Sequence, residues 1–389
     1  MTPNEDAALG ATMALVDGDL FGGPPWPTLP GRDYHAPEVF AFEREAVFAG
    51  SWMCVARAEQ LPDAGDYLTA EIAGETPIVL RGADGILRAF ANTCRHRGTM
   101  LLEGSGSVRT VIKCPYHAWT YALDGRLAGS PNVDLDDGID RGEVSLWPIA
   151  LAEWEGFVFV NLDGQAPPLG EVVATQPDSP LELARYAIGD LRVGARREYD
   201  VAANWKVVVE NYHECLHCPT VHPELVKIVP LYRSGEVEED GQLLGNSMGH
   251  GLTSFTASGL STLPTLPGLD EVDAHTFYGV YLFPNVILNY HSETVNAVTI
   301  VPLAPARTRV ISEFLFRPET IAADGFDPGE VVEFRDLVAQ QDWRVCELAQ
   351  RGVSSRYYTA GMYPRQEKWI AAFNRRYLDA RGGLPAERA

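Results

Sequence analysis

The pattern of apolar and polar residues predicts an all-β region in the first half of the chain. A helix is expected first, over residues 36–50, with Pro37 near its start and Gly50 at its end. From about Trp52 to Leu162 short runs of alternating or β-branched residues are separated by turn sequences such as Asp84-Gly85. The predicted strands include Tyr67–Ile72, Thr76–Leu80, Ile86–Phe90 and Phe157–Asn161. Several short strands with regular turns indicate a small all-β domain.

The second half of the chain has a mixed pattern. A polar stretch, Asp163–Pro180, is typical of a connection between domains. A helix is predicted over Asn204–His217, and strands are predicted within Phe277–Val301. A long helix is expected from Asp327-Pro328 to about Arg351. Strands followed by a C-terminal helix predict an α+β domain.

Composition and charge narrow the functional classes. The net charge of −22 argues against partners with anionic surfaces, so we expect no nucleic-acid and no membrane partner. The N-terminus has no basic, apolar signal sequence, and no apolar run is long enough to span a membrane. We therefore expect a cytoplasmic protein. Six scattered cysteines are too few for a disulfide scaffold of this size, and two of them sit beside histidines, which favours metal binding.

Four potential metal ligands stand as two close pairs in the β region. Cys94-x-His96 is followed by Cys114-x-x-His117, so each of two loops offers one thiolate and one imidazole. A tetrahedral zinc ion accepts two cysteines and two histidines. A Rieske [2Fe-2S] cluster uses the same side chains, with both thiolates on one iron and both imidazoles on the other. The residues predict a metal centre and leave these alternatives open.

A second set of potential ligands lies at the end of the second predicted helix. Glu214, His217 and His222 form the pattern Glu-x-x-His-x-x-x-x-His, and Glu214 and His217 would share one helix face. Pro219 and Pro223 predict that the helix ends between the histidines, so His222 can swing back toward His217. Two histidines and a carboxylate make the triad of non-haem iron(II) oxygenases, and Glu214 is the local carboxylate.

Two stretches of sequence resemble a known family. NTCRHRG and CPYHAWTYALDGRL are similar to the ligand loops of Rieske non-haem iron oxygenases, the ring-hydroxylating oxygenase alpha-subunit family. The resemblance extends from about residue 34 to residue 385. It implies a Rieske [2Fe-2S] cluster held by Cys94, His96, Cys114 and His117, together with a separate mononuclear Fe(II).

The same resemblance implies the fold class, α+β. It comprises an all-β Rieske domain, expected over residues 51–165, and a helix-grip (START-like) catalytic domain with an antiparallel sheet, expected over residues 166–389. Residues 1–50 would form an N-terminal segment that packs with the catalytic domain.

The resemblance also assigns the iron ligands. It takes the carboxylate from the C-terminal helix, where Asp342 stands at the ligand position and Asp336 and Glu347 are the rivals. His217, His222 and Asp342 would then hold the mononuclear iron.

Glu214 has a different role in this family pattern. It would bridge His217 and the cluster ligand His117 of a neighbouring subunit, as an electron-transfer link in a head-to-tail homotrimer. An NAD(P)H-dependent reductase of the flavin or ferredoxin type would supply the electrons, and a small molecule and O2 would be the substrates.

The substrate is inferred from finer likeness. ENYHECLHCPTVHPEL and FPNVILNYHSE look most like the branch that acts on choline, betaines and carnitine, where N-methyl hydroxylation leads to demethylation. The aromatic residues expected to line its pocket are Phe277, Tyr278, Tyr281, Phe283 and Tyr290. Hydroxylation or dihydroxylation of an aromatic acid is the alternative. A protein of another class, an electron carrier or a zinc-structured binding protein, would not need the second site. Cys215, Cys218 and Cys346 are expected to be ordinary buried residues.

Overall fold

The chain forms two compact units. The computed structural model describes residues 24–131, 140, 142–176, 179–237 and 245–382. One unit is Phe48–Leu169, and the other is formed by the chain before and after it. The predicted division at residues 50 and 165 stays a prediction, and residues 1–23 of the expected N-terminal segment lie outside the described part.

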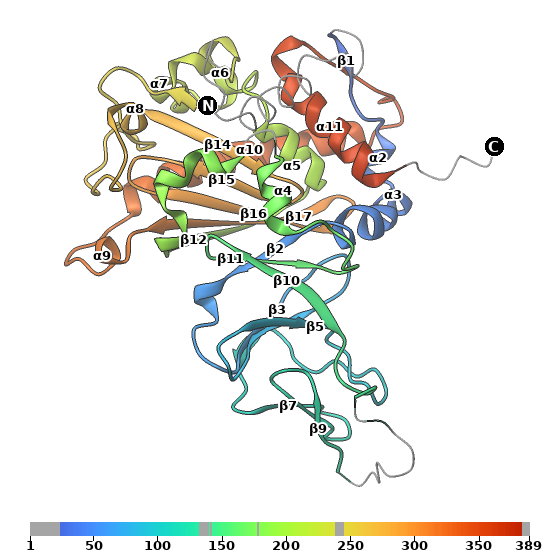
Figure 1. Cartoon of the computed structure of the whole chain (residues 1–389). Coiled ribbons are helices and arrows are strands. Elements are labelled where there is room, and N and C mark those ends of the chain that lie inside the picture. The colour runs from blue at the N-terminus through green and yellow to red at the C-terminus, as the bar shows by residue number, and fades with distance from the viewer. Residues whose placement is uncertain (1–23, 132–139, 141, 177–178, 238–244, 383–389) are drawn as a thin grey trace, which may run out of the picture. The chain divides into compact units, whose positions relative to one another are not determined.

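The Phe48–Leu169 unit is built from antiparallel strands (Figure 1). A seven-stranded sheet has the order β2-β11-β10-β5-β4-β3-β6. Its strands are β2 (Met53–Arg57), β3 (Asp66–Thr69), β4 (Ile78–Arg81), β5 (Leu87–Phe90), β6 (Ser105–Ser107), β10 (Pro148–Trp154) and β11 (Phe157–Asn161). A second sheet of three strands contains β7 (Val111–Lys113), β8 (Thr120–Ala122) and β9 (Leu127–Gly129). The expected all-β domain is confirmed.

The other unit is built on a six-stranded antiparallel sheet of order β12-β17-β16-β15-β14-β13. Its strands are β12 (Arg192–Val201), β13 (Gly245–Ser247), β14 (Thr276–Leu282), β15 (Val286–Tyr290), β16 (Val295–Ala304) and β17 (Arg307–Phe316). The three strands predicted between Phe277 and Val301 are therefore present as β14, β15 and β16. This sheet is the antiparallel sheet expected of the catalytic domain.

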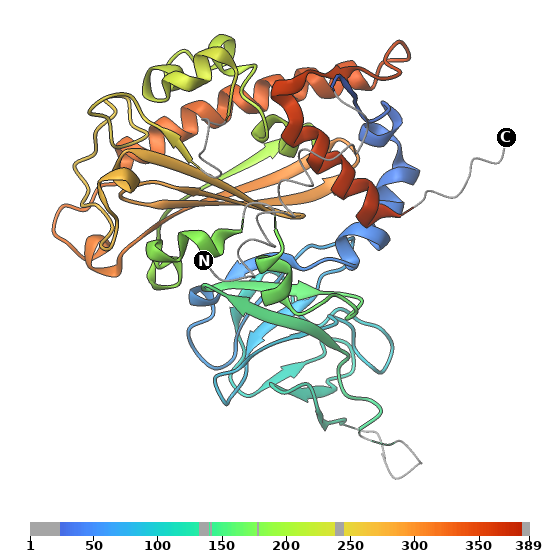
Figure 2. The same cartoon turned by 45° about the horizontal axis from the view of Figure 1, so that its top comes forward.

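Helices complete this second unit (Figure 2). The longer ones are α3 (Pro37–Glu43), α5 (Trp205–Tyr212), α10 (Gly329–Val353) and α11 (Lys368–Arg381). Helix α10 contacts α5 and β12, and α5 contacts β16, so both helices pack on the sheet. Short pieces include α2 (Arg32–His35), α4 (Leu169–Ala174), α6 (Cys218–Val221), α7 (Leu225–Ile228), α8 (Glu271–Ala274) and α9 (Pro318–Ile321). A two-stranded ladder pairs β1 (Trp26–Pro27) with β18 (Met362–Tyr363).

The helix predicted over Asn204–His217 is correct at its start and wrong at its end. Asn204 is the N-cap, and its side chain accepts the N–H of Lys206. The helix ends at Tyr212, because His213 Nδ1–H donates to the Val209 carbonyl and later N–H groups bond elsewhere. The structure therefore overturns the expectation that Glu214 and His217 share a helical face.

The predicted long C-terminal helix is confirmed as α10. It begins at Gly329 with Pro328 as the N-cap residue, one position later than predicted, and the Asp327 carboxylate accepts the N–H of Gly329. Among the residues that the structure describes, no helix combines the length and the apolar composition needed to cross a membrane.

Candidate metal centres

Two loops of the β unit hold Cys94 and Cys114 in the same backbone arrangement. Each cysteine N–H donates to the carbonyl five residues later, at 2.8 Å in both loops. Each cysteine carbonyl accepts an N–H from the residue four positions later, Gly98 or Ala118. Both of these residues have a left-handed backbone conformation, with φ of 73° and 57°. The loops thus repeat one tight turn, which places each cysteine at the base of a loop.

The four side chains of these loops form one group. The rings of His96 and His117 lie 4.7 Å apart between centroids. Both sulfurs are buried, whereas His96 is exposed. Burial raises the pKa of Cys114, but hydrogen bonds from the N–H groups of Tyr116 and His117 and from Cys94 outweigh it, so the net pKa is lowered. Two buried sulfurs, with imidazoles nearer the surface, fit a centre that carries its thiolates on one metal and its imidazoles on another.

In the second unit, Glu214 organises the loop between α5 and α6. Its Oε2 accepts the N–H groups of Leu216 and His217, the groups that would otherwise continue the helix. Its Oε1 accepts Nδ1–H of His217 at 2.5 Å. Glu214 and His217 therefore meet, as predicted, through a turn rather than through a helix face.

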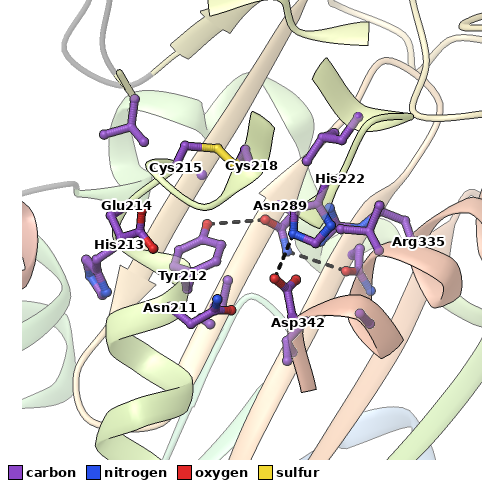
Figure 3. Close-up of a pocket in the computed structure, with 18 of the residues that line it drawn as sticks. Asn211, Tyr212, His213, Glu214, Cys215, Cys218, His222, Asn289, Arg335 and Asp342 are labelled. Carbon is purple, nitrogen blue, oxygen red and sulfur yellow. Dashed lines mark hydrogen bonds and ion pairs between the residues drawn. A yellow bond between two sulfur atoms is a disulfide. The ribbon is translucent and has the colours of Figure 1, made fainter. Parts of the chain in front are cut away.

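His217, His222 and Asp342 converge in the structure. Nε2 of His222 lies 2.8 Å from Asp342 Oδ1, and Nε2 of His217 lies 3.3 Å from the same oxygen. Figure 3 shows Asp342 on α10 directed toward His222. Ligand atoms at about 2.1 Å from a metal, at right angles, are about 3 Å apart. The three side chains thus have the spacing of ligands on one face of a metal ion.

Both imidazoles are oriented by their other nitrogen. Nδ1–H of His217 donates to Glu214, and Nδ1–H of His222 donates to Gln341 Oε1 at 2.7 Å. Gln341 is held in that orientation because its Nε2 donates to Glu224. These bonds hold each ring with Nε2 directed at Asp342, the nitrogen that would bind a metal once its proton is displaced, as outer hydrogen bonds do at metal-bound histidines. Gln341 was not identified from the sequence, where nothing distinguishes it from other polar helix residues.

The protonation of this group follows from its contacts. Burial by itself lowers the pKa of His217. Hydrogen bonds to Asp342 and Glu214 outweigh this effect and raise the pKa to about 9. Burial raises the pKa of Asp342, but its hydrogen bonds to both histidines outweigh this and lower it. A metal ion that binds here would displace the proton that His217 shares with the Asp342 carboxylate.

The rival carboxylates lie elsewhere. Asp336 accepts the Tyr199 hydroxyl at 2.7 Å and the side chain of Gln340. Glu347 accepts the N–H of Ala202 at 3.2 Å. Of the three acids considered on this helix, Asp342 alone meets the histidines.

The cysteines beside the histidines differ from the expectation. Cys215 and Cys218 form a disulfide, so the prediction that they are ordinary buried residues is wrong. The Cys-x-x-Cys spacing was the feature of the sequence from which this disulfide could have been predicted. Cys218 Sγ lies 3.8 Å from His217 Nε2, but a sulfur in a disulfide is not a thiolate ligand. Cys346 is buried and unpaired, as expected.

The histidines open onto a cavity of about 200 Å³ between the sheet and the helices. Phe277 and Tyr281 line it, as predicted. Tyr278 and Tyr290 do not, because they pair across β14 and β15 and point to the opposite face of the sheet. Phe283 lies beyond the strand, under the guanidinium of Arg376. Other aromatic lining residues, which the sequence analysis missed, are Tyr199, Tyr212, Tyr232, Phe255, Trp343 and Trp369.

A line of polar side chains crosses the sheet below the histidines. The Tyr212 hydroxyl donates to Asn289, whose amide donates to Asn296, whose amide donates to Ser312. All four line the cavity. A methyl group at Gly279 would lie 2.5 Å from the Tyr212 hydroxyl, so this glycine makes room for it. The cavity is therefore lined by aromatic rings together with one row of polar side chains.

An all-β unit with a two-cysteine, two-histidine centre and an α+β unit with a 2-His-1-carboxylate cavity define the class of Rieske-type non-haem iron oxygenases. Residues 188–382 match the family "Ring hydroxylating alpha subunit (catalytic domain)", and residues 51–139 match the "Rieske [2Fe-2S] domain". The chain belongs to the ring-hydroxylating oxygenase alpha-subunit family. It is an oxidoreductase whose cofactors are a Rieske [2Fe-2S] cluster and a mononuclear iron, and the zinc alternative for the first centre is thereby set aside.

Individual relatives support this assignment. The chain is 34% identical over 335 residues to a carnitine monooxygenase oxygenase subunit of Acinetobacter pittii, covering 85% of this chain and 86% of that one. It is 32% identical over 370 residues to a glycine betaine monooxygenase oxygenase subunit of Chromohalobacter salexigens, covering 87% and 82%. A solved quaternary ammonium Rieske monooxygenase in complex with L-carnitine is similar with a TM-score of 0.70 and 30% identity, covering 92% of this chain and 95% of that one.

Proposed function

We propose that this chain is the terminal oxygenase that hydroxylates an N-methyl group of a small quaternary ammonium compound. His217, His222 and Asp342 hold the mononuclear iron, and Cys94, His96, Cys114 and His117 hold the cluster. The observation that carries the iron assignment is the approach of both Nε2 atoms to one oxygen of Asp342 at a cavity with many aromatic lining residues.

The substrate class is supported by the relatives and by the cavity. The relatives named above are described as acting on carnitine and glycine betaine, both of which carry a trimethylammonium group. A cation of this type has no N–H to donate, so it is bound by aromatic faces rather than by hydrogen bonds. Tyr212, Phe277, Tyr281 and Trp369 offer such faces around the cavity, whose volume of about 200 Å³ suits a small molecule.

The chain's own residues prepare the reaction. Iron at this site would supply the dioxygen chemistry, with electrons from the cluster. Glu214 and Gln341 hold the imidazoles in place, so little reorganisation is needed when the substrate binds. The aromatic walls exclude water and place the methyl group near the histidines. A hydroxylated N-methyl group then leaves as formaldehyde and a proton, with the C–N bonding pair retained by the amine.

Electron delivery requires further partners. We propose that Glu214 links the iron ligand His217 to the cluster ligand His117 of a neighbouring subunit in a homotrimer. The short bond between Glu214 and His217 supports the first half of this link. A separate NAD(P)H-dependent reductase is the electron donor, consistent with relatives that are described as oxygenase subunits.

The Glu214→Gln variant tests the bridge. An amide oxygen still accepts Nδ1–H of His217, so we expect both metal centres to remain. Electron transfer from the reduced cluster in a single turnover is expected to slow by about 100-fold, because the charged link is lost. Glu224→Gln, which alters a nearby acid that accepts Gln341 Nε2–H and does not contact His217, is the matched control. A parent-like single-turnover rate in Glu214→Gln would remove the bridging role.

Product analysis tests the function itself. Reduced, iron-loaded protein and O2 are combined with glycine betaine, choline or carnitine, and formaldehyde is measured against substrate lost. One formaldehyde per substrate is expected for at least one compound. Trimethylamine and an aldehyde as products would place oxidation on the carbon chain instead. Turnover of aromatic acids alone would favour the alternative substrate class.

A further inference from the structure

A sulfur atom lies beside the two histidines of the iron site. Cys218 Sγ is 3.8 Å from Nε2 of His217, and one ligand atom each of His217, Cys218 and His222 lies within 4.8 Å of the other two. Nitrogen and sulfur donors on one metal ion are separated by about 3 Å at a right angle and by up to about 4.4 Å when they lie on opposite sides. The sulfur is therefore at the edge of the coordination sphere that the histidines define.

The backbone holds Cys218 in this position independently of its side chain. Its N–H donates to the carbonyl of Cys215 at 3.0 Å, and its own carbonyl accepts the N–H of His222 at 2.9 Å. His217 precedes it directly in the chain. Both cysteines are buried from solvent and line the cavity (Figure 3). A change in the bonding of the side chain alone would thus leave the sulfur within reach of a metal ion.

The two cysteines are not equivalent with respect to the metal. Among the His, Cys, Asp and Glu side chains that the structure describes, the group of close potential ligands contains Cys218 but not Cys215. Cys215 is instead the partner that binds the Cys218 sulfur in a disulfide. A thiolate is a metal ligand, whereas a sulfur in a disulfide is not a thiolate. The bond to Cys215 therefore withholds from the metal the sulfur that lies next to it.

The state of this bond changes the set of donors that a metal ion meets. With the disulfide intact, the donors are two imidazoles and the carboxylate of Asp342, a set that suits iron(II). A thiolate is a softer ligand and favours zinc. Zinc has no redox chemistry, so a site that holds it cannot activate dioxygen. Withholding the Cys218 sulfur thus preserves an iron site.

We propose that Cys218 is a latent ligand of the mononuclear metal, withheld by its disulfide with Cys215 and released when a small dithiol reduces that bond. The inference concerns regulation of the iron site in the proposed function and rests on that site. The dithiol supplies two electrons and two protons to the S–S bond, which breaks into two thiols, and the dithiol itself becomes a cyclic disulfide. The Cys218 thiol gives up its proton to solvent as its sulfur binds the metal. The bound thiolate favours zinc over iron, and oxygenase turnover stops.

A matched pair of variants tests the ligand. Cys215→Ser removes the disulfide and leaves Cys218 free, whereas Cys218→Ser removes the disulfide and leaves Cys215 free. The loop loses the same constraint in both, so the variants differ in which thiol is free. The mononuclear metal is removed from the holoprotein with a chelator and replaced by Co(II), and the spectrum of the metal-free sample is subtracted to cancel the cluster absorption. We expect a thiolate-to-cobalt charge-transfer band in Cys215→Ser and none in Cys218→Ser.

The parent protein tests the switch without a mutation. Co(II) added to the untreated parent should give no thiolate band. Co(II) added after treatment with dithiothreitol, and after removal of the excess, should give the band of Cys215→Ser. Zinc affinity, measured by competition with a chromogenic chelator, should rise by at least about 30-fold on the same treatment. Alkylation followed by mass spectrometry shows which cysteines are free in each sample, and the cluster spectrum shows that the fold is retained.

Three results would overturn the inference. They are bands of equal strength in the two variants, no band in Cys215→Ser protein that retains its cluster, and a parent disulfide that survives dithiothreitol. If Cys215→Ser does not retain its cluster, the treated parent decides, and a reduced parent without the band overturns the inference.

Failure of the proposed iron site gives a different result, for which His222→Ala is the probe. If the iron site is right and the latent ligand is wrong, the untreated parent binds Co(II), His222→Ala weakens that binding, and Cys215→Ser shows no thiolate band. If the iron site itself is wrong, His222→Ala binds Co(II) as tightly as the parent does.

Discussion

At the scale of single residues, the iron site depends on which atom of each side chain is already engaged. Nδ1 of each histidine donates to an outer carboxylate or amide, so Nε2 is left for a metal. The same principle separates the acids on α10, because Asp336 is committed to Tyr199 whereas Asp342 faces both imidazoles. Residue type predicts a candidate ligand, but only the partners of its other atoms show whether it is available.

The pair Asp342→Asn and Asp336→Asn tests this assignment. Replacing Asp342 removes the charged ligand, and we expect mononuclear iron affinity to fall by at least about 100-fold. Total iron should drop from about three to about two per chain, with about two acid-labile sulfides retained in the cluster. Asp336→Asn should keep about three irons, since asparagine still accepts the Tyr199 hydroxyl. Iron loss in the Asp336 variant alone would assign the ligand to that residue.

At the scale of elements, the loop between α5 and α6 decides the position of His217. The carboxylate of Glu214 takes two backbone N–H groups of the loop, and the Cys215–Cys218 disulfide closes it around His217. A helix would have put successive side chains around an axis, whereas this turn directs Glu214 and His217 toward each other. The loop therefore holds His217, the proposed iron ligand, in a defined position.

Removing the disulfide is expected to make the loop that carries His217 more mobile. Closing so short a loop stabilises the fold by about 2 kcal/mol at most, so the Cys218→Ser variant should remain folded with its cluster intact. Mononuclear iron should nevertheless dissociate several-fold faster, because His217 gains freedom. Cys346→Ser, at a buried free thiol on α10, is the control. Alkylation of the denatured parent without reductant should spare Cys215 and Cys218, and labelling of both would show that they are free thiols in solution.

At the scale of the whole molecule, segments far apart in sequence are joined around a buried polar network. The Lys206 ammonium pairs with Glu43 at 2.5 Å, with both side chains fully buried, and the Tyr377 hydroxyl donates to the same carboxylate. Nearby, the Tyr34 hydroxyl donates to Glu210 at 2.8 Å. These contacts tie α2 and α3 to α5 and α11, and so connect the N-terminal segment to the C-terminal helix.

This network makes stability depend on pH. Burial raises the pKa of Glu210 to about 7, although hydrogen bonds from Tyr34 and the charge of Lys206 oppose the shift. The folded state therefore holds a proton that the unfolded state has released, and the stabilisation is complete below about pH 4.5 and lost as pH rises to about 7. Glu210→Gln should melt like the parent at pH 5 and be more stable at pH 7.5, by roughly 2–3 kcal/mol. A constant difference in melting temperature across this range would contradict the raised pKa.

Much of the fold could be predicted because its elements have local causes. Phe157–Asn161 was predicted as a strand and is β11, and the long helix α10 begins within one residue of its predicted start. The end of α5 could not be predicted in the same way. It depends on a side chain, Glu214, that captures N–H groups of the following turn, and helix propensity carries no information about that competition.

The lining of the cavity was predictable only in part. Phe277 and Tyr281 were expected there and are found there, but Tyr278 and Tyr290 were assigned to the wrong face. Alternation along a strand shows which residues share a face, but it does not say which face is covered by helices.

By itself, the sequence determined the family, the two cofactors and the candidate residues of both centres. Short ligand spacings within one loop are local, so they can be recognised without knowing how the rest of the chain folds. Only the tertiary structure shows that Asp342, rather than Asp336 or Glu347, meets His217 and His222. This contact joins residues more than a hundred positions apart. It depends on how α10 packs against the sheet, and no local pattern contains that information.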